Sequence, residues 1–190
     1  MRSRACHFLV GVCLLLPFSF AAAESADVPE EFKVCFGFGC KSSQWVRLNE
    51  VEWGQVKSLF NQVTDARTER RRIKEAVAMM ETLVGQYSPT HRDIGRNWLF
   101  SNYKAAPRTG QMDCIDESLN TTTYLKLMEN IGVLRYHLVQ RRAYRNNFFA
   151  QHWAAEILDI ATGQNYVVDS WFRDNGELPY LVKGESWYNF

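Results

Sequence analysis

The chain has 190 residues, of which 46% are hydrophobic and 23% charged. This length accommodates one compact domain, and the composition excludes disorder as the main state as well as collagenous or low-complexity sequence. The formal net charge of +1 lacks the basic excess that nucleic-acid binding requires, so we expect no nucleic-acid partner.

The first 23 residues have the features of a secretory signal peptide. Arg2 and Arg4 precede a mostly apolar stretch from Phe8 to Phe20, and Ala21-Ala22-Ala23 is an A-x-A cleavage site. The apolar stretch is short for a membrane span, with an uncleaved N-terminal anchor as the alternative. We therefore expect an exported, periplasmic or extracellular protein, with one domain over residues 24–190 and no stable membrane span after cleavage.

Cysteine usage predicts one disulfide and one unpaired thiol. Cleavage of the signal peptide removes Cys6 and Cys13 and leaves Cys35, Cys40 and Cys114. In an oxidising compartment an even pair is expected to bridge. The first two flank a glycine-containing loop, CFGFGC, so we predict that they pair and that the third stays a thiol. The alternative is free or differently paired thiols.

The middle of the chain has helical periodicity. After a polar lead-in over residues 24–34 and the CFGFGC loop, apolar residues recur three or four positions apart from Trp53 onward. We predict two helices, or one bent helix, from about Asn49 to Tyr87, with Ser88-Pro89 as the stop.

The remaining sequence predicts a loop, a helix and then strands. Residues 88–112 contain several prolines and glycines and form a predicted loop, with a short helix around 93–100. A helix follows from about Cys114 to Asn130, ended by Gly132. Strands are predicted over 133–140, 148–158 and 166–171, with a turn between the last two. Helices followed by an antiparallel sheet give an α+β fold.

Cys114 lies in GQMDCIDES, at the start of the predicted helix. A helix N-terminus favours the thiolate, and its N–H groups can stabilise an oxyanion beside the sulfur. Asp113, Asp116 and Glu117 oppose the thiolate, so a reactive Cys114 needs a basic partner. The same acidic group has the oxygen ligands that Ca²⁺ prefers, but we interpret it as a charged helix start and expect no cofactor and no metal.

His152 and Asp169 are the candidate partners of Cys114. His152, in AQHWAAEI, can take the thiol proton, and Asp169, in YVVDSW on the next strand, can orient the imidazole. A direct pairing of the two requires a hairpin centred between residues 160 and 161. A tight turn at Thr162-Gly163 would place Asp169 opposite Glu156 instead, so the triad predicts an asymmetric loop or a bulge here. The alternative is an inert buried cysteine and a structural histidine.

The run from Asp113 to Trp171 resembles the transglutaminase-like superfamily of papain-related cysteine enzymes, most closely the bacterial transglutaminase-like cysteine proteinases. The motifs that carry the resemblance are DCIDES, ENIGV, HWAAEI and VVDSW, over about a third of the chain. The resemblance implies a transglutaminase-like, papain-related core, in which Cys114 is the nucleophile, His152 the general base and acid, and Asp169 the orienting group.

Parts of this stretch depart from the family pattern. Ser118, Asn120 and the threonines at 121–123 stand where the family has small or apolar residues, which indicates a different pocket or a weakened enzyme. The family also leads us to expect a side-chain oxyanion donor before the cysteine, for which the candidates are Gln111, Asn97, Trp98 and Asn102. For substrate binding, the candidate walls of a cleft are Trp98, Trp153 and Trp171, with core packing as the alternative.

Together these features predict an exported thiol hydrolase of the cysteine peptidase or amidase type. Its partner would be a protein or peptide substrate, cleaved at a peptide or isopeptide amide bond through Cys114, His152 and Asp169. Two alternatives stay open at this point. One is a protein-crosslinking transglutaminase with the same triad, and the other is a non-catalytic exported binding or assembly module that keeps the fold.

Overall fold

A computed structural model describes residues 31–96, 110–147 and 150–189 of the chain. The predicted signal peptide and the candidates Asn97, Trp98 and Asn102 lie outside the described residues. The elements, in chain order, are β1 (Phe32–Phe36), β2 (Ser42–Val46), α1 (Glu50–Ser58), α2 (Ala66–Gly85), the 3₁₀-helix η1 (Pro89–Arg92), α3 (Cys114–Asn130), β3 (His137–Val139), β4 (Ala143–Asn147), β5 (Ala150–Asp159), β6 (Asn165–Asp169), β7 (Tyr180–Lys183) and α4 (Gly184–Tyr188). The predicted α+β class is confirmed.

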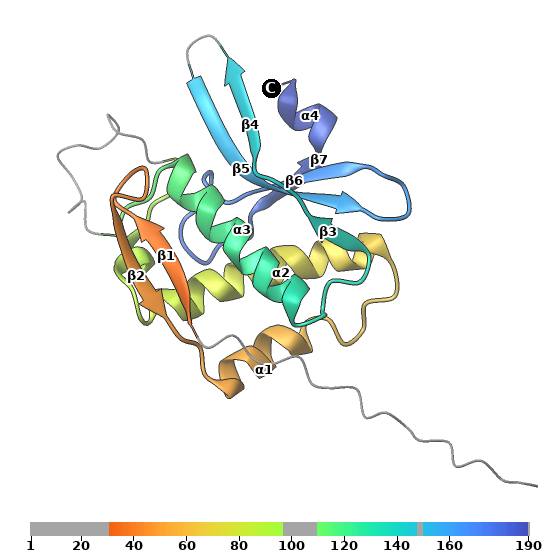
Figure 1. The fold of residues 1–190 in the computed structure, drawn as a ribbon, viewed down its shortest axis with the longest axis horizontal. Helices are drawn as coiled ribbons and strands as arrows, with labels where there is room; N and C mark the ends of the chain where they lie inside the picture. The colour runs from red at the N-terminus through yellow and green to blue at the C-terminus, as the bar shows by residue number, and fades with distance from the viewer. Residues whose placement is uncertain (1–30, 97–109, 148–149, 190) are drawn as a thin grey trace, which may run out of the picture.

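Helix α3 lies between two antiparallel sheets (Figure 1). The hairpin β1–β2 packs on one side of α3, and β5, near the centre of the five-stranded sheet, packs on the other. Helix α2 packs against α3, and α1 packs against α2. Apolar side chains from these helices and both sheets meet in one core. This packing fixes the first residue of α3 relative to β5.

The predicted helices from Asn49 to Tyr87 are confirmed as two, α1 and α2. The Asn49 side chain caps α1 in a capping box, and the Asp65 side chain caps α2. The apolar residues that recur along this region are buried in the core, Trp53 and Met80 with 0% exposure. Tyr87, at the end of the predicted pattern, is 40% exposed because α2 ends two residues earlier, at Gly85.

The strands were predicted only in part. The helix over 114–130 and the strands β3, β5 and β6 match the prediction in place, although β3 is shorter. Strands β1, β2, β4 and β7 were not predicted. Each of these four is only four or five residues long, which is too short for a sustained alternation of apolar and polar residues.

A bulge interrupts the strand along one edge of β5. β3 pairs with the end of β5, with Val139 opposite Ile157, and β4 pairs with its start, with Ala143 opposite Ala154. Residues 140–142 therefore stand opposite only residues 155 and 156, which is the arrangement of a β-bulge. Because a bulge redirects the side chains that it carries, this one sets the positions of Arg141 and Arg142.

A buried carboxylate joins α2 to the entry of the large sheet. Glu69, with 0% exposure, accepts hydrogen bonds from the N–H groups of Arg135 at 2.8 Å and Tyr136 at 3.0 Å. His137 Nδ1 donates to the same carboxylate at 3.0 Å, and Arg70 donates to the other ring nitrogen at 3.1 Å. One side chain thus satisfies three donors where β3 begins.

We predict that Glu69→Ala lowers the free energy of unfolding by about 3–5 kcal/mol, because it leaves buried donors without an acceptor. Urea unfolding followed by circular dichroism measures this change. The control is Glu75→Ala on the same helix, whose side chain is 38% exposed and pairs only with Arg72, and whose cost is about 0.5 kcal/mol or less. Equal costs for the two variants would contradict the role given to Glu69.

Candidate functional site

His152 and Asp169 are joined by a buried hydrogen bond. His152 Nε2 lies 2.8 Å from Asp169 Oδ2, and their side chains are 7% and 1% exposed. Because an ionised carboxylate only accepts, Nε2 carries the proton, and in the neutral ring Nδ1 is the acceptor. Nδ1 makes no hydrogen bond to the described part of the chain. The ring is therefore held in the tautomer that can accept a proton at Nδ1.

The register of the β5–β6 hairpin differs from both registers considered for the sequence. Ala155 pairs with Val168, so the hairpin centres between residues 161 and 162. Continuing the register places Asp169 opposite Ala154, two residues from His152 on the same face of β5. Such diagonal neighbours lie about 7–8 Å apart at Cα, a gap that these two side chains span. The prediction of an asymmetric loop or bulge in this hairpin is therefore wrong. The two strands pair regularly, and His152 reaches Asp169 through a diagonal contact.

Aromatic rings enclose His152. Its ring centroid lies 4.9 Å from that of Trp171, 5.4 Å from that of Phe172 and 5.6 Å from that of Trp187. Trp187, on the C-terminal helix α4, also donates its Nε1–H to Asp169 Oδ2 at 2.8 Å. The orientation of the imidazole is thus fixed by one carboxylate, and that carboxylate is fixed in turn by an indole. The other oxygen, Asp169 Oδ1, is buried without a hydrogen-bond partner.

Cys114 is the first residue of α3. The backbone N–H of Trp153, the residue after His152, lowers the pKa of the Cys114 thiol, so the thiol lies near the β5 backbone. β6 ends at Asp169, which leaves this stretch of β5 without a paired strand on that edge among the described residues. No hydrogen bond joins Cys114 to His152, although the structure describes both residues. The structure therefore shows no direct contact between the thiol and the imidazole.

The environment of Cys114 favours the neutral thiol. Burial raises the pKa of the Cys114 thiol above its ordinary value, and the carboxylates of Asp113 and Asp169 raise it further. The N–H groups of Trp153 and of Cys114 itself lower this pKa, but they do not offset burial and the two carboxylates together. The expectation from the sequence that acidic neighbours oppose the helix N-terminus is thus confirmed for Asp113.

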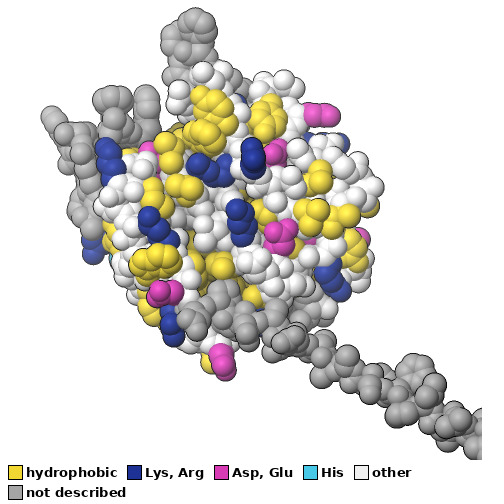
Figure 2. Space-filling model, viewed as in Figure 1, with side chains coloured by type: hydrophobic (Ala, Val, Ile, Leu, Met, Phe, Trp, Pro, Cys, Tyr) yellow, Lys and Arg dark blue, Asp and Glu magenta, His cyan; other side chains and the backbone are white. Residues whose placement is uncertain are grey.

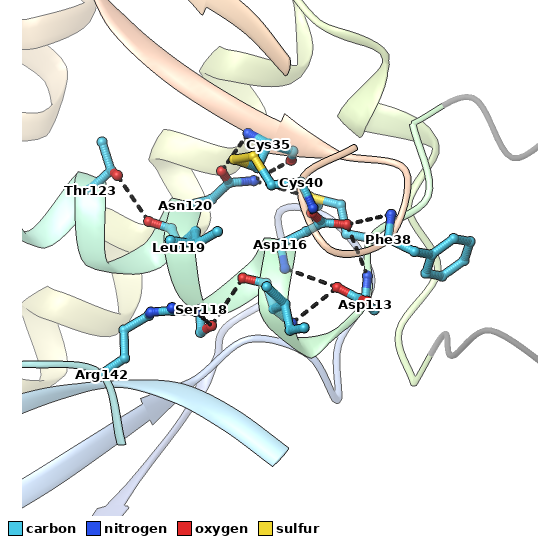
Figure 3. Close-up of a disulfide and its surroundings, with 12 residues drawn as sticks. Cys35, Phe38, Cys40, Asp113, Asp116, Ser118, Leu119, Asn120, Thr123 and Arg142 are labelled. Atoms are coloured by element: carbon cyan, nitrogen blue, oxygen red, sulfur yellow. Dashed lines mark hydrogen bonds between the residues drawn. A yellow bond between two sulfur atoms is a disulfide. The ribbon is translucent and has the colours of Figure 1, made fainter. Parts of the chain in front are cut away.

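The predicted disulfide between Cys35 and Cys40 is present, and its loop is attached to the start of α3 (Figure 3). The Asp116 carboxylate accepts the N–H groups of Phe38, at 2.7 Å, and of Cys40. The Asn120 side chain exchanges two hydrogen bonds of 2.8 Å with the backbone of Cys35. A loop far away in sequence therefore holds the helix that carries the thiol.

These contacts explain the polar residues of α3 that depart from the family pattern. Asn120 binds the disulfide loop, and Ser118 accepts a hydrogen bond of 3.0 Å from Arg142 (Figure 3). Thr121 bonds to Ser170, just after β6, at 2.7 Å. The polar positions thus attach α3 to its surroundings on several sides.

The acidic residues at the start of α3 have structural partners. Asp113 caps the helix by accepting from the N–H groups of Ile115 and Asp116, and Asp116 holds the disulfide loop. Within the described ranges, no group of three or more His, Cys, Asp or Glu side chains is placed to hold a metal ion.

Three buried carboxyl groups lie beneath this end of α3. Burial raises the pKa of Glu81 to about 7 and of Asp93 to about 8, and it raises the pKa of Glu117 well above its ordinary value. Asp93 and Glu117 are hydrogen-bonded to each other, which requires a proton on one of them. Two of these acids precede the helix by more than 20 residues, so no local pattern in the sequence indicates the cluster.

The other predicted site residues have mixed outcomes. Trp171 touches His152, whereas Trp153 is half-buried on the other face of β5. The Gln111 side chain donates to the Arg92 carbonyl, so this amide is engaged in the loop before α3. Among residues that the sequence did not single out, Trp187 holds Asp169; the only signal was the aromatic C-terminal sequence GESWYNF.

A cavity of about 370 Å³ opens beside the His152–Asp169 pair. Its walls are mostly aromatic and apolar, with two guanidinium groups, and are formed by Arg96, Arg145, Asp169, Phe172, Tyr180, Val182 and Trp187. Asp169 is therefore reached from the side of α4, through this cavity.

Comparisons with protein-family models, with curated proteins and with solved structures find no match to this chain. In the described ranges no helix is both long and apolar enough to cross a membrane.

We predict that Asp113→Asn increases the rate of iodoacetamide alkylation of Cys114 at pH 8 by about threefold, because removing a nearby negative charge lowers the pKa of the thiol. Asparagine still caps a helix, so α3 keeps its start. Mass spectrometry of the labelled protein gives the rate. Asp65→Asn, the same change at the cap of α2, is the control and should leave the rate unchanged.

We also predict that stability falls as the pH rises from about 5 to about 8. The pKa values of Glu81 and Asp93 in the folded chain, about 7 and about 8, exceed the unfolded value of about 4. The folded state therefore binds more protons in this range, and each released proton costs about 1.4 kcal/mol per pH unit. Urea unfolding between pH 5 and pH 8 measures the slope.

Glu117→Gln should reduce this slope, because it removes one carboxyl group from the cluster. Glu177→Gln, at an exposed position, is the control and should leave the slope as it is. A wild-type stability that is flat or rises between pH 5 and pH 8, with no change in Glu117→Gln, would show that the cluster is not protonated in the folded protein.

Proposed function

We propose that this protein is an exported thiol hydrolase that cleaves peptide or isopeptide amide bonds, with a transglutaminase-like, papain-related core. Cys114 would be the nucleophile, His152 the general base and acid, and Asp169 the orienting group. The observation that carries the proposal is the buried hydrogen bond from His152 to Asp169, with the sulfur of Cys114 at the backbone of the next residue along β5.

The tautomer of His152 supports the role of a base. With Nε2–H bound to Asp169, the Nδ1 lone pair is the atom that accepts the thiol proton. Asp169 then stabilises the imidazolium that forms. Because the thiol is neutral at rest, deprotonation accompanies attack on the substrate, as in general base catalysis, and no thiolate–imidazolium pair is stored beforehand.

The proposed reaction is an acyl transfer, first from the amide to the Cys114 sulfur and then to water. The Cys114 sulfur adds to the carbonyl carbon of the substrate while its proton moves to His152 Nδ1. The C–N bond of the tetrahedral intermediate breaks, and the amine leaves with that proton. Water, deprotonated by the same imidazole, then hydrolyses the thioester and regenerates the thiol. Attack by an amine in place of water would give the crosslinking reaction of a transglutaminase.

Two backbone donors are candidates for stabilising the intermediate. The N–H groups of Cys114 and Trp153 both lower the pKa of the Cys114 thiol, so both act on the sulfur and would be the nearest donors for the oxygen of an attacked carbonyl. The Asp113 cap takes the N–H groups of Ile115 and Asp116 and leaves the Cys114 N–H to this role. A backbone pair of this kind would replace the side-chain donor expected from the family.

Export rests on two features. The N-terminal sequence has the pattern of a secretory signal peptide. The Cys35–Cys40 disulfide is a bond that persists in oxidising compartments. A periplasmic or extracellular location agrees with both.

A non-catalytic binding module is the alternative, and one observation favours it. Cys114 and His152 are not hydrogen-bonded, and the environment of the thiol raises its pKa. The thiol would then be an inert buried side chain, and the aromatic residues around His152 would serve a partner.

We expect purified mature protein to hydrolyse a fluorogenic casein substrate, with Cys114→Ala abolishing activity and Asp169→Asn lowering it by about 10²–10⁴-fold. His152→Gln should abolish activity and slow iodoacetamide alkylation of Cys114 at pH 7 by about tenfold, since the base that takes the thiol proton is lost. Alkylation followed by mass spectrometry does not depend on knowing the substrate.

The control for folding is thermal unfolding of each variant, because His152 and Asp169 are buried. A folded His152→Gln variant whose Cys114 is alkylated at the wild-type rate would refute the role of His152 as base. In that case the binding module would stand as the function.

A further inference from the structure

A second cavity, of about 420 Å³, lies on the face of the molecule formed by α3 and the β3–β5 region. Figure 2 shows Lys and Arg side chains gathered over α3 and the adjoining strands on this face. The cavity is lined by Leu119, Thr122, Thr123, Lys126, Gln140, Arg141, Arg142 and Trp153. We call it the basic pocket. No acidic residue is among these lining residues.

The basic pocket holds polar groups that lack partners. Lys126 and Arg141 are exposed on its rim and form no ion pair among the described residues. Thr122 Oγ1 is buried in its wall without a hydrogen-bond partner. The cationic groups on the rim are the ones open to a ligand, and two cations without ion pairs favour an anionic ligand.

Arg142 shapes this pocket. The bulge at residues 140–142 places its guanidinium over the Trp153 ring, 4.6 Å from the centroid. A hydrogen bond of 3.0 Å to Ser118 fixes the group further. A guanidinium held in one plane presents its remaining N–H groups as a fork, which matches the planar geometry of a carboxylate.

The basic pocket is connected to Cys114. The backbone N–H of Trp153, whose ring forms one wall, lowers the pKa of the Cys114 thiol. Arg142 is close enough to Cys114 for the two groups to interact electrostatically. Along α3, the lining residues Leu119 and Thr122 are five and eight residues after Cys114, or about 7–12 Å at 1.5 Å per residue.

We propose that the basic pocket binds the carboxylate of an Asp or Glu side chain of the substrate. At about 3.3 Å per residue of extended peptide, the acidic residue would be about two to four positions from the bond that Cys114 attacks. The inference rests on the proposed function, since it names the substrate class of that site. The ligand is a peptide carboxylate because the pocket adjoins a thiol placed to attack amides and holds a planar cationic fork.

The test measures binding, so that it does not depend on turnover. Folded Cys114→Ala protein is titrated by NMR with capped hexapeptides of mixed small residues that contain one Glu, and with the same peptides containing Gln instead. The Glu peptides should bind about tenfold more tightly, the effect of one charge-assisted hydrogen bond. Adding Lys126→Gln and Arg141→Gln should reduce this preference, because two of the three cations are lost while Arg142 remains. The two side chains are exposed, so their loss should not unfold the protein.

A matched control uses a separate basic site. Arg71 and Lys74 of α2 line a different cavity that shares no residue with the basic pocket. Arg71→Gln with Lys74→Gln removes the same charge and should leave the Glu preference unchanged. Equal binding of Glu and Gln peptides, or a preference that Lys126→Gln with Arg141→Gln leaves unchanged, would overturn the inference.

A third peptide set, with phosphoserine in place of Glu, separates carboxylate from phosphate. Tight binding of phosphoserine peptides with no preference of Glu over Gln would also overturn the carboxylate assignment. Failure of the proposed function has a different signature: the Glu preference would persist in Cys114→Ala while the wild type neither hydrolyses casein nor shows alkylation that depends on His152.

Discussion

The contact between the first turn of α3 and strand β5 is the constraint on which the candidate site depends. It brings the Cys114 thiol close enough to the backbone of Trp153, the residue after His152, for that N–H to lower the thiol pKa. The contact is possible because β6 ends at Asp169, which leaves the edge of β5 open at that level. A longer β6 would cover the backbone that the thiol reaches, so the end of one strand defines the site as much as its side chains do.

The same packing sets the chemistry of the thiol. Burial and the nearby carboxylates of Asp113 and Asp169 outweigh the helix N-terminus, and the pKa of Cys114 rises. Asp169 acts on both groups, since it disfavours the thiolate and holds the imidazole through a hydrogen bond of 2.8 Å. A site of this kind suits a base that acts during attack, with the substrate bringing sulfur and imidazole into contact.

Helix α3 is polar on several sides because it is attached on several sides. Asp116 and Asn120 hold the disulfide loop, and Ser118 and Thr121 reach toward the large sheet. These residues read as departures from a family pattern when the sequence is considered alone. In the structure they join the thiol-bearing end of α3 to the hairpin β1–β2 and to the bulge that carries Arg142, so the departures support the site.

The sequence by itself determined the local features: the apolar face of α1 and α2, the helix that starts at Cys114, and the Cys35–Cys40 bridge, which follows from counting cysteines in an oxidising compartment. These depend on neighbours within a few positions, or on composition. Only the tertiary structure decided the diagonal contact of His152 with Asp169, the bond from Trp187 and the bulge at Arg142. The physical reason is that strand register and helix docking are set by side chains that pack across the whole core. A shift of one or two residues changes every cross-strand pairing, and the local sequence pattern does not reveal which register is adopted.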